Sequence, residues 1–151
     1  MNGDLTQSQE DYLETVLLCA RENGHAHVKE IAEYLNVRMA SVTGALRTLS
    51  KSGLVNYEPY GTVTLTEEGA KIASSVQSRH ALLERFMRFV LGLDAGVARE
   101  NACRMEHTMD DRALERMTSY MEFIENCPLD GCTWQEERGG FCRKADEAGC
   151  K

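Results

Sequence analysis

Residues 28–66 decide the fold of this chain and read VKEIAEYLNVRMASVTGALRTLSKSGLVNYEPYGTVTLT. Apolar residues recur at helical spacing over 28–35 and again over 39–52, and a turn at 36–38 separates the two segments. The apolar residues then alternate in twos on both sides of EPYG at 58–61, which predicts a β-hairpin. A short helix, a tight turn, a second helix and a hairpin follow one another in winged helix-turn-helix domains, and we predict that fold here.

Helical periodicity continues on both sides of this stretch. Before it, residues 7–22 show the apolar spacing of a helix, and Thr6 or Ser8 can cap its first turn. After it, a long helix starts at Glu67 and runs to about Arg79 or beyond. The predicted winged helix-turn-helix unit therefore has helices at both of its ends.

The second half of the chain is also helical by its spacing. From His80 onward the pattern predicts these buried residues: Leu82, Leu83, Phe86, Phe89, Val90 and Leu93. Asp94 can cap a further helix over 95–107, and a last helix covers 111–126. A helical segment of about 45 residues makes only a small core by itself. We therefore expect a partner subunit, and a homodimer is the commonest arrangement.

Composition limits the class of protein. A chain of 16.9 kDa with 42% hydrophobic and 27% charged residues is typical of a globular protein. No apolar run approaches the roughly 18 residues of a membrane helix, and the N-terminal residues lack the pattern of a secretory signal, so we expect a cytoplasmic location. The net charge of −7 disfavours a constitutive nucleic-acid binder. A DNA-binding role therefore has to be reconciled with this acidic net charge.

The second helix of the helix-turn-helix would be the recognition helix. Small and hydroxyl side chains near its start allow close approach to base edges, and its basic side chains suit phosphates. The candidate DNA-binding residues are Arg38, Ala40, Ser41, Thr43, Arg47 and Lys51. Gly44, in the middle of this helix, lowers the helix propensity by roughly 1 kcal/mol.

Metal-ligand side chains recur at helical spacing on three predicted helices. They are Asp11 with Glu14, His80 with Glu84, and Cys103 with Glu106 and His107. Residues three or four apart share one helix face, so each set can point at one ion. Imidazole, carboxylate and thiolate together suit a first-row divalent transition metal better than Ca²⁺ or Mg²⁺. Each set also has an ordinary alternative, such as acids that favour a helix dipole or a surface ion pair.

The chain resembles a known family of metal-activated repressors. The segments EDYLETV, IAEYLNVRMASVTGALRTLSKSGLV, TVTLTEEGAKIA, SRHALLERF and ACRMEH together look like the diphtheria toxin repressor and manganese transport regulator family, over about residues 7 to 126. The resemblance implies a mainly α protein in which a winged helix-turn-helix DNA-binding domain precedes an all-α dimerisation and metal-binding domain. We place the first domain at 1–74, the second at 75–126 and a Cys-rich tail at 127–151.

The resemblance also implies ligand roles. The activating site would be formed by Asp11, Cys103, Glu106 and His107. A second, adjacent site would use His80 and Glu84, and Glu14 would join His80 and Glu106 if the chain follows the manganese-type members. Arg99 stands where iron-type members carry a second-site histidine, which departs from that pattern.

The function implied is that of a homodimeric repressor that binds a double-stranded DNA operator when metal is bound, and so controls iron or manganese homeostasis. We expect one or two Fe²⁺ or Mn²⁺ ions per subunit, with Fe²⁺ favoured because a thiolate is a soft ligand. The bound cations also neutralise carboxylates, which partly answers the objection from the acidic net charge.

Four cysteines crowd into the C-terminal tail: Cys127, Cys132, Cys142 and Cys150. Their spacing fits no strong zinc template, and Zn²⁺ binding, an iron–sulfur cluster, a redox switch and a reduced surface tail all stay open. Two other functions stay open as well. One is a metal-independent winged-helix regulator that senses thiol oxidation or a small molecule. The remoter one is a metallohydrolase built on His80, Glu84, Glu106 and His107. With no phosphate loop and no nucleophile elbow, we expect no enzyme.

Overall fold

The computed structural model describes residues 5–21, 23–59, 61–126, 132–135 and 140–143. The chain divides into two compact units, and the boundary between them falls between Gln77 and Ser78. That boundary lies within one continuous helix, α4 (Glu67–Phe89).

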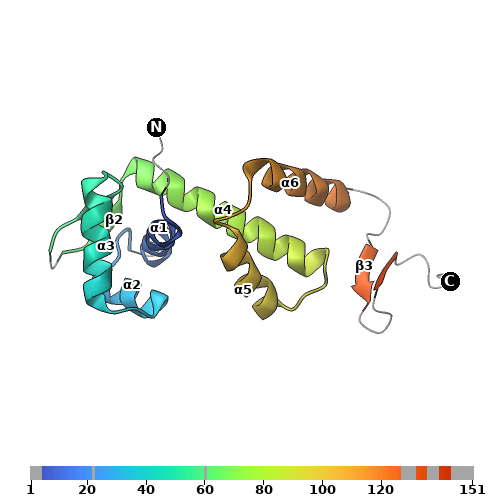
Figure 1. Ribbon diagram of the computed structural model, residues 1–151, viewed down its shortest axis with the longest axis horizontal. Coiled ribbons are helices and arrows are strands. Elements are labelled where there is room, and N and C mark those ends of the chain that lie inside the picture. Colours follow the sequence, from blue (N-terminus) through green and yellow to red (C-terminus); the bar gives the residue numbers. More distant parts are fainter. Residues whose placement is uncertain (1–4, 22, 60, 127–131, 136–139, 144–151) are drawn as a thin grey trace. The chain divides into compact units, whose positions relative to one another are not determined.

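The first unit is a winged helix-turn-helix, as the sequence predicted (Figure 1). It contains α1 (Gln7–Cys19), α2 (Val28–Leu35), α3 (Met39–Lys51), and the antiparallel strands β1 (Val55–Tyr57) and β2 (Val63–Leu65). The start of α4 follows β2 directly. Helix α1 ends three residues before the predicted position.

Local signals set the ends of these elements. Thr6 caps α1: its side chain accepts a hydrogen bond from the Gln9 amide, while the Gln9 side chain accepts one from the Thr6 amide. Asn36 ends α2 with a left-handed backbone at φ 53°, a conformation that asparagine tolerates better than most residues. An asparagine at position 36 therefore favours the tight turn between α2 and α3.

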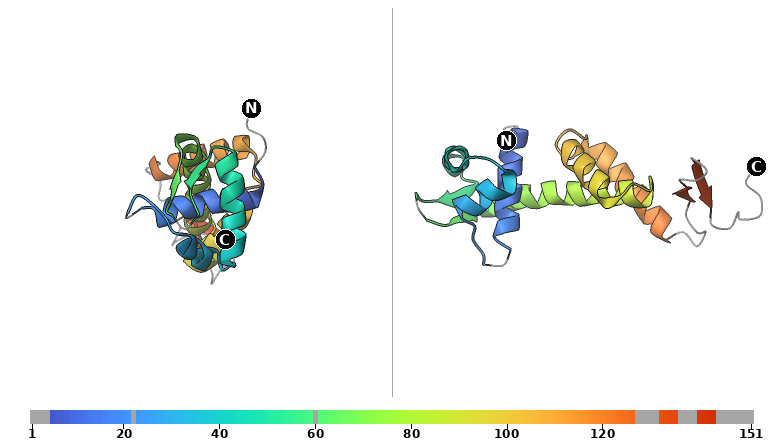
Figure 2. Two further views of the ribbon diagram at one scale, coloured as in Figure 1. Left: turned by 90° about the vertical axis from the view of Figure 1, so that its left-hand side faces the viewer. Right: turned by 90° about the horizontal axis from the view of Figure 1, so that it is seen from below.

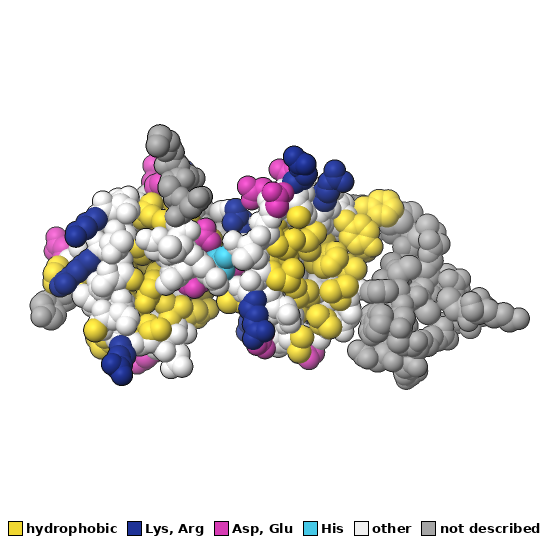
Figure 3. All heavy atoms as spheres, in the orientation of Figure 1, with side chains coloured by type: hydrophobic (Ala, Val, Ile, Leu, Met, Phe, Trp, Pro, Cys, Tyr) yellow, Lys and Arg dark blue, Asp and Glu magenta, His cyan; other side chains and the backbone are white. Residues whose placement is uncertain are grey.

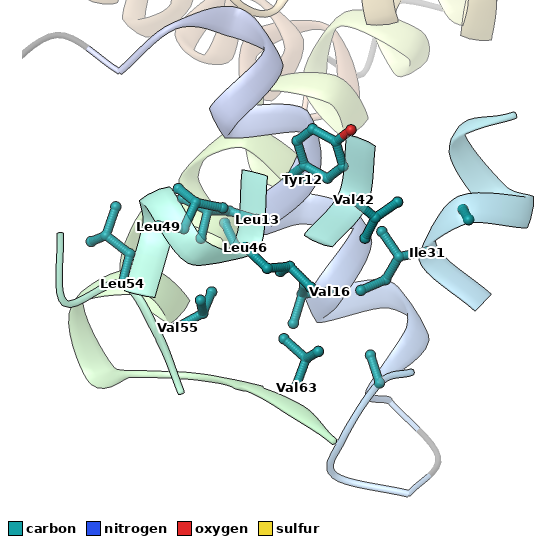
Figure 4. Close-up of a cluster of buried hydrophobic side chains, with 13 residues drawn as sticks. Tyr12, Leu13, Val16, Ile31, Val42, Leu46, Leu49, Leu54, Val55 and Val63 are labelled. Carbon is teal, nitrogen blue, oxygen red and sulfur yellow. The ribbon is translucent and has the colours of Figure 1, made fainter. Parts of the chain in front are cut away.

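The core of the first unit joins all its elements. Figure 4 shows Leu13 and Val16 of α1 converging with Leu46 of α3 and Val63 of β2. These four side chains are fully buried. Burial of each such side chain contributes about 1.5–3 kcal/mol, so this cluster holds α3 firmly against the rest of the unit.

Gly69, in the first turn of α4, lies very close to the backbone of Leu54, the residue before β1. A Cβ atom at this position would overlap the carbonyl oxygen of Leu54 and lie 2.9 Å from its carbonyl carbon. Leu54 also accepts a hydrogen bond from the Thr66 amide, 3.1 Å, which fixes its carbonyl in place. Glycine at position 69 therefore permits a close approach of two backbone segments.

The second unit contains the C-terminal part of α4, α5 (Ala95–Met105) and α6 (Asp111–Asn126). In Figures 1 and 2 both shorter helices lie beside this part of α4, and Leu83, Ala102 and Leu114 form their common core. Asp94 caps α5, as predicted, by accepting hydrogen bonds from the amides of Gly96 and Val97. Among the described residues this cluster has three buried members against thirteen in the core of the first unit, which agrees with the small core expected from the sequence.

Two predictions for this half were wrong. Phe89 was expected inside, but it is 63% exposed at the end of α4, because helical spacing marks an apolar face of a helix without showing what covers it. The tail was expected to be irregular, but β3 (Cys132–Gln135) and β4 (Gly140–Arg143) pair as an antiparallel hairpin. Threonine, tryptophan and phenylalanine in these segments favour strands, a signal that the charged and glycine-rich surroundings masked.

Within the described parts of the chain, no helix is both long and apolar enough to cross a membrane.

Candidate metal centre

Glu106 is the centre of a donor cluster in the second unit. It is the C-cap residue of α5, its amide donates to the Ala102 carbonyl (3.0 Å), and the residue is only 1% exposed. Because the Glu106 amide still makes the hydrogen bond of a helical residue, the backbone at the end of α5 fixes the direction in which the Glu106 side chain points. A buried carboxylate is costly unless a cation or hydrogen-bond donors compensate for its lost hydration.

Two imidazoles supply part of this compensation. The His80 Nδ1 atom lies 2.6 Å from Oε2 of Glu106, and the His107 Nε2 atom lies 3.2 Å from Oε1. The His107 side chain is 2% exposed. A carboxylate held between two imidazoles is a donor set that suits Fe²⁺, Mn²⁺ or Zn²⁺, and burial restricts competition from solvent. The residues therefore fit a first-row divalent ion.

Glu84 contacts both this cluster and two arginines. Its Oε2 atom lies 3.6 Å from Nε2 of His80, so both ring nitrogens of His80 face carboxylates. Arg88 Nη1 lies 3.5 Å from Oε1 of Glu84, and Arg99 Nε lies 3.9 Å from Oε2. Sequence reasoning did not predict that either arginine contacts Glu84. Arg88 follows Glu84 by four residues on α4 and so could have been found, whereas the Arg99 contact depends on how α5 packs against α4.

The remaining predicted ligands fall into two groups. Cys103 lies on α5 one turn before Glu106, is exposed, and takes part in no disulfide bond. Asp11 and Glu14 lie on α1, in the first unit, and both are partly buried. The structure thus brings His80, Glu84, Glu106 and His107 together in one unit, and the roles of Cys103, Asp11 and Glu14 stay predictions.

The predicted recognition helix is α3, and its candidate residues are accessible. Arg38, Ala40, Ser41, Arg47 and Lys51 are exposed, and Thr43 is partly buried. Residues 34–57 contain three basic and no acidic side chains, in a chain whose net charge is −7. Figure 3 shows Lys and Arg side chains on the side of the first unit that α3 forms. Such local positive charge suits a phosphate backbone, and the individual DNA contacts stay predictions.

The four tail cysteines do not form a described site. Cys132 is the register partner of Arg143, and Cys142 is the register partner of Thr133, so the two cysteines are not opposite each other in the hairpin. Cys127 and Cys150 lie outside the described residues. The predicted Zn²⁺ or iron–sulfur site at these cysteines therefore stays a prediction.

A winged helix-turn-helix joined to a helical unit with a buried histidine and carboxylate cluster defines a class, the metal-responsive DNA-binding regulators. Two family models match this chain: the iron dependent repressor N-terminal DNA binding domain over residues 4–63, and the iron dependent repressor metal binding and dimerisation domain over residues 66–135. The chain belongs to the iron dependent repressor family, as the resemblance in its sequence implied.

Individual relatives agree with this assignment. An uncharacterized HTH-type transcriptional regulator of Methanocaldococcus jannaschii is 40% identical over 119 residues, which cover 78% of this chain and 95% of that protein. A manganese-dependent transcriptional repressor solved in complex with manganese superposes with a TM-score of 0.71 at 27% identity, covering 89% of this chain and 61% of the other.

The manganese regulator SloR superposes with a TM-score of 0.69 at 28% identity, covering 93% of this chain and 65% of that one. The chain therefore spans less than two thirds of the length of these two solved structures.

Proposed function

We propose that this protein is a metal-activated transcriptional repressor that controls iron or manganese homeostasis. The observation that carries the proposal is the buried Glu106 carboxylate between the imidazoles of His80 and His107. Family membership supplies the DNA-binding and dimerisation parts of the proposal.

We assign the ligands as follows. Glu106, His107 and Cys103 would hold the activating ion together with Asp11, and His80, Glu84 and Glu14 would hold a second ion. The Cys103 thiolate favours Fe²⁺ over Mn²⁺, since thiolate is the softer ligand. Arg88 and Arg99 lie beside Glu84 and compete with an ion for its carboxylate, so we expect the second position to bind metal more weakly than the first.

Ligands on α1 and ligands in the second unit would couple metal binding to the arrangement of the two units. Two such chains in a dimer present two copies of α3, and their separation must match two DNA half-sites about one helical turn apart. A bound ion would supply positive charge to the ligand side chains on α1 and in the second unit. A shift of the competent population from 1:99 to 99:1 requires about 5.5 kcal/mol of differential affinity, within the range of metal binding by protein ligands.

An exposed apolar face on the second unit supports the dimer. The large exposed hydrophobic residues of this unit are Phe89, Leu91, Val97, Tyr120 and Phe123. Figure 3 shows hydrophobic side chains gathered over one face of this unit. A continuous apolar face of this kind is typical of an interface between subunits.

We expect Phe123→Asp to convert the dimer into a monomer, because a carboxylate would be placed in an apolar interface. Tyr34→Asp, on α2, is the matched control, since Tyr34 is 62% exposed and Phe123 is 65% exposed. Sedimentation velocity at several protein concentrations measures the outcome. A Phe123→Asp variant that sediments as a dimer would show that this face is not the dimer interface.

We expect Arg47→Ala to weaken DNA binding at all sequences and to reduce the slope of log K against log salt by about 1, as loss of one phosphate contact requires. Lys71→Ala is the control, since Lys71 is exposed on α4 and pairs with Glu67 at 2.9 Å. Fluorescence anisotropy between 50 and 200 mM salt, roughly the range where such slopes are resolved, tests this. An unchanged slope would place Arg47 away from the phosphates.

The proposed function is tested by anaerobic DNA-binding titrations on the upstream region of the protein's own gene, with chelator, Fe²⁺ or Mn²⁺. We expect tight binding with metal and loss of binding with chelator. Equal binding under all three conditions would reject metal activation and favour a regulator that senses thiol oxidation or a small molecule.

A further inference from the structure

His25 and His27 lie together in the DNA-binding unit, and the metal centre in the second unit uses neither. They flank Ala26, which forms an isolated β-bridge with Val63 of β2. The amide of each bridge residue donates to the carbonyl of the other, and both distances are 2.8 Å. In an extended segment, residues two apart point to the same side, so both imidazoles lie on one side of this bridge.

The separation of the two rings matches a shared metal ion. Their centroids are 5.2 Å apart, and the ring planes cross at 89°. A tetrahedral zinc ion has Zn–N distances of about 2.0–2.1 Å, which places the centroids of two coordinating imidazoles about 5 Å apart. The centroid separation is thus the one that chelation requires, and a rotation of the edge-to-face rings would bring one nitrogen of each toward a common ion.

The neighbouring charges also favour a cation at this position. The Glu30 carboxylate Oε2 accepts a hydrogen bond from the His27 amide at 2.8 Å, which holds a negative charge beside the pair. The nearby basic side chain, Lys29, is directed to Glu33, 3.8 Å away. His27 is exposed and His25 is partly buried, so an ion can reach both rings from solvent.

Cys19 shares this environment but is a poor candidate ligand. Burial raises the pKa of the Cys19 thiol, and the Glu30 carboxylate raises it further. The thiol therefore stays protonated at neutral pH, and thiolate is the form that binds metals. The site consists of two imidazoles, with solvent in the remaining positions.

We propose that His25 and His27 form a separate metal site, on the surface of the DNA-binding unit, for divalent ions that prefer imidazole, such as Zn²⁺, Ni²⁺ or Cu²⁺. With two protein ligands, this site is weaker and exchanges faster than a centre with three or four. It lies beside the turn end of the β1–β2 hairpin, because Ala26 pairs with Val63, the first residue of β2, whose partner in β1 is Tyr57.

The test follows the four histidine rings of the full-length chain by NMR during a titration with ZnCl₂. Single His→Asn variants assign the ring signals. We expect the His25 and His27 signals to shift together, at one common zinc concentration. In the His25→Asn variant, we expect the zinc affinity at His27 to fall at least about tenfold, since a chelate becomes a single ligand.

Ring signals of His25 and His27 that do not move, or that move at different zinc concentrations, would overturn the proposal. Signals of His27 that respond equally in wild type and His25→Asn would also overturn it. The amide signals of Ala26 and Val63 report whether the β-bridge survives in the variant. The signals of His80 and His107 report separately on the metal centre, so the failure of one site is distinguishable from the failure of the other.

Discussion

We expect Glu106→Gln to abolish metal-dependent DNA binding while the two units stay folded. Glutamine keeps the size of the side chain and removes the charge that lies between His80 and His107. Loss of an outer partner of a metal ligand typically lowers metal affinity 10–100-fold, so loss of a direct carboxylate ligand should lower it by about 100-fold or more. Because DNA binding depends on bound metal under the proposed function, we expect the metal-stimulated DNA affinity to disappear as well.

The matched control is Glu100→Gln on the same helix. Glu100 is exposed and pairs with Arg104 one turn later, so its loss changes only a surface ion pair, worth at most about 1 kcal/mol. Calorimetric metal titration and DNA-binding anisotropy should separate the two variants, and circular dichroism should show the same helix content in both. A Glu106→Gln variant with the metal and DNA affinities of the wild type would contradict the assignment of Glu106 as a ligand.

The second large effect concerns stability. Gly69→Ala should lower the free energy of unfolding of the first unit by roughly 2–3 kcal/mol or more, although alanine favours helices over glycine by about 1 kcal/mol. The added methyl group would overlap the Leu54 carbonyl oxygen, and backbone atoms cannot rotate away as a flexible side chain does. Denaturant unfolding followed by circular dichroism measures the change.

Gly44→Ala is the control for this prediction. Gly44 lies within α3, and a Cβ atom there would have no atom within 4 Å. Its substitution should therefore stabilise the unit by up to about 1 kcal/mol, through helix propensity alone. If both variants shift stability in the same direction and by similar amounts, the close approach of Gly69 to Leu54 does not limit the packing of α4.

Local signals made most of the fold predictable. The capping side chains at Thr6 and Asp94, and the change from helical to alternating spacing before the hairpin, act over a few residues and are visible in the sequence. The exposure of Phe89 was not predictable, because helical spacing shows which face of α4 is apolar but not whether a partner subunit covers it. The β3–β4 hairpin was missed because two strands of four residues carry little periodicity.

The candidate site was partly predictable for the same reason. His80 and Glu84 are four residues apart on α4, so their proximity follows from helix geometry. The burial of Glu106 and the contact between Arg99 and Glu84 depend on how α5 packs against α4, and no local pattern contains that information. Resemblance to the family, rather than spacing, supplied the link between Asp11 on α1 and the donors of the second unit.

The central claim is that metal binding and DNA binding are coupled, and the affinity of the metal with and without DNA tests it most directly. Coupling free energies are reciprocal: if the metal raises the DNA affinity by some factor, the DNA must raise the metal affinity by the same factor. The measurement is an anaerobic competition titration of Fe²⁺ and of Mn²⁺ against a chelator of known affinity, with and without the upstream DNA. We predict that the DNA raises the affinity for the activating ion at least about tenfold, and that Glu106→Gln removes this gain. A metal affinity that DNA leaves unchanged in the wild-type protein would contradict the account.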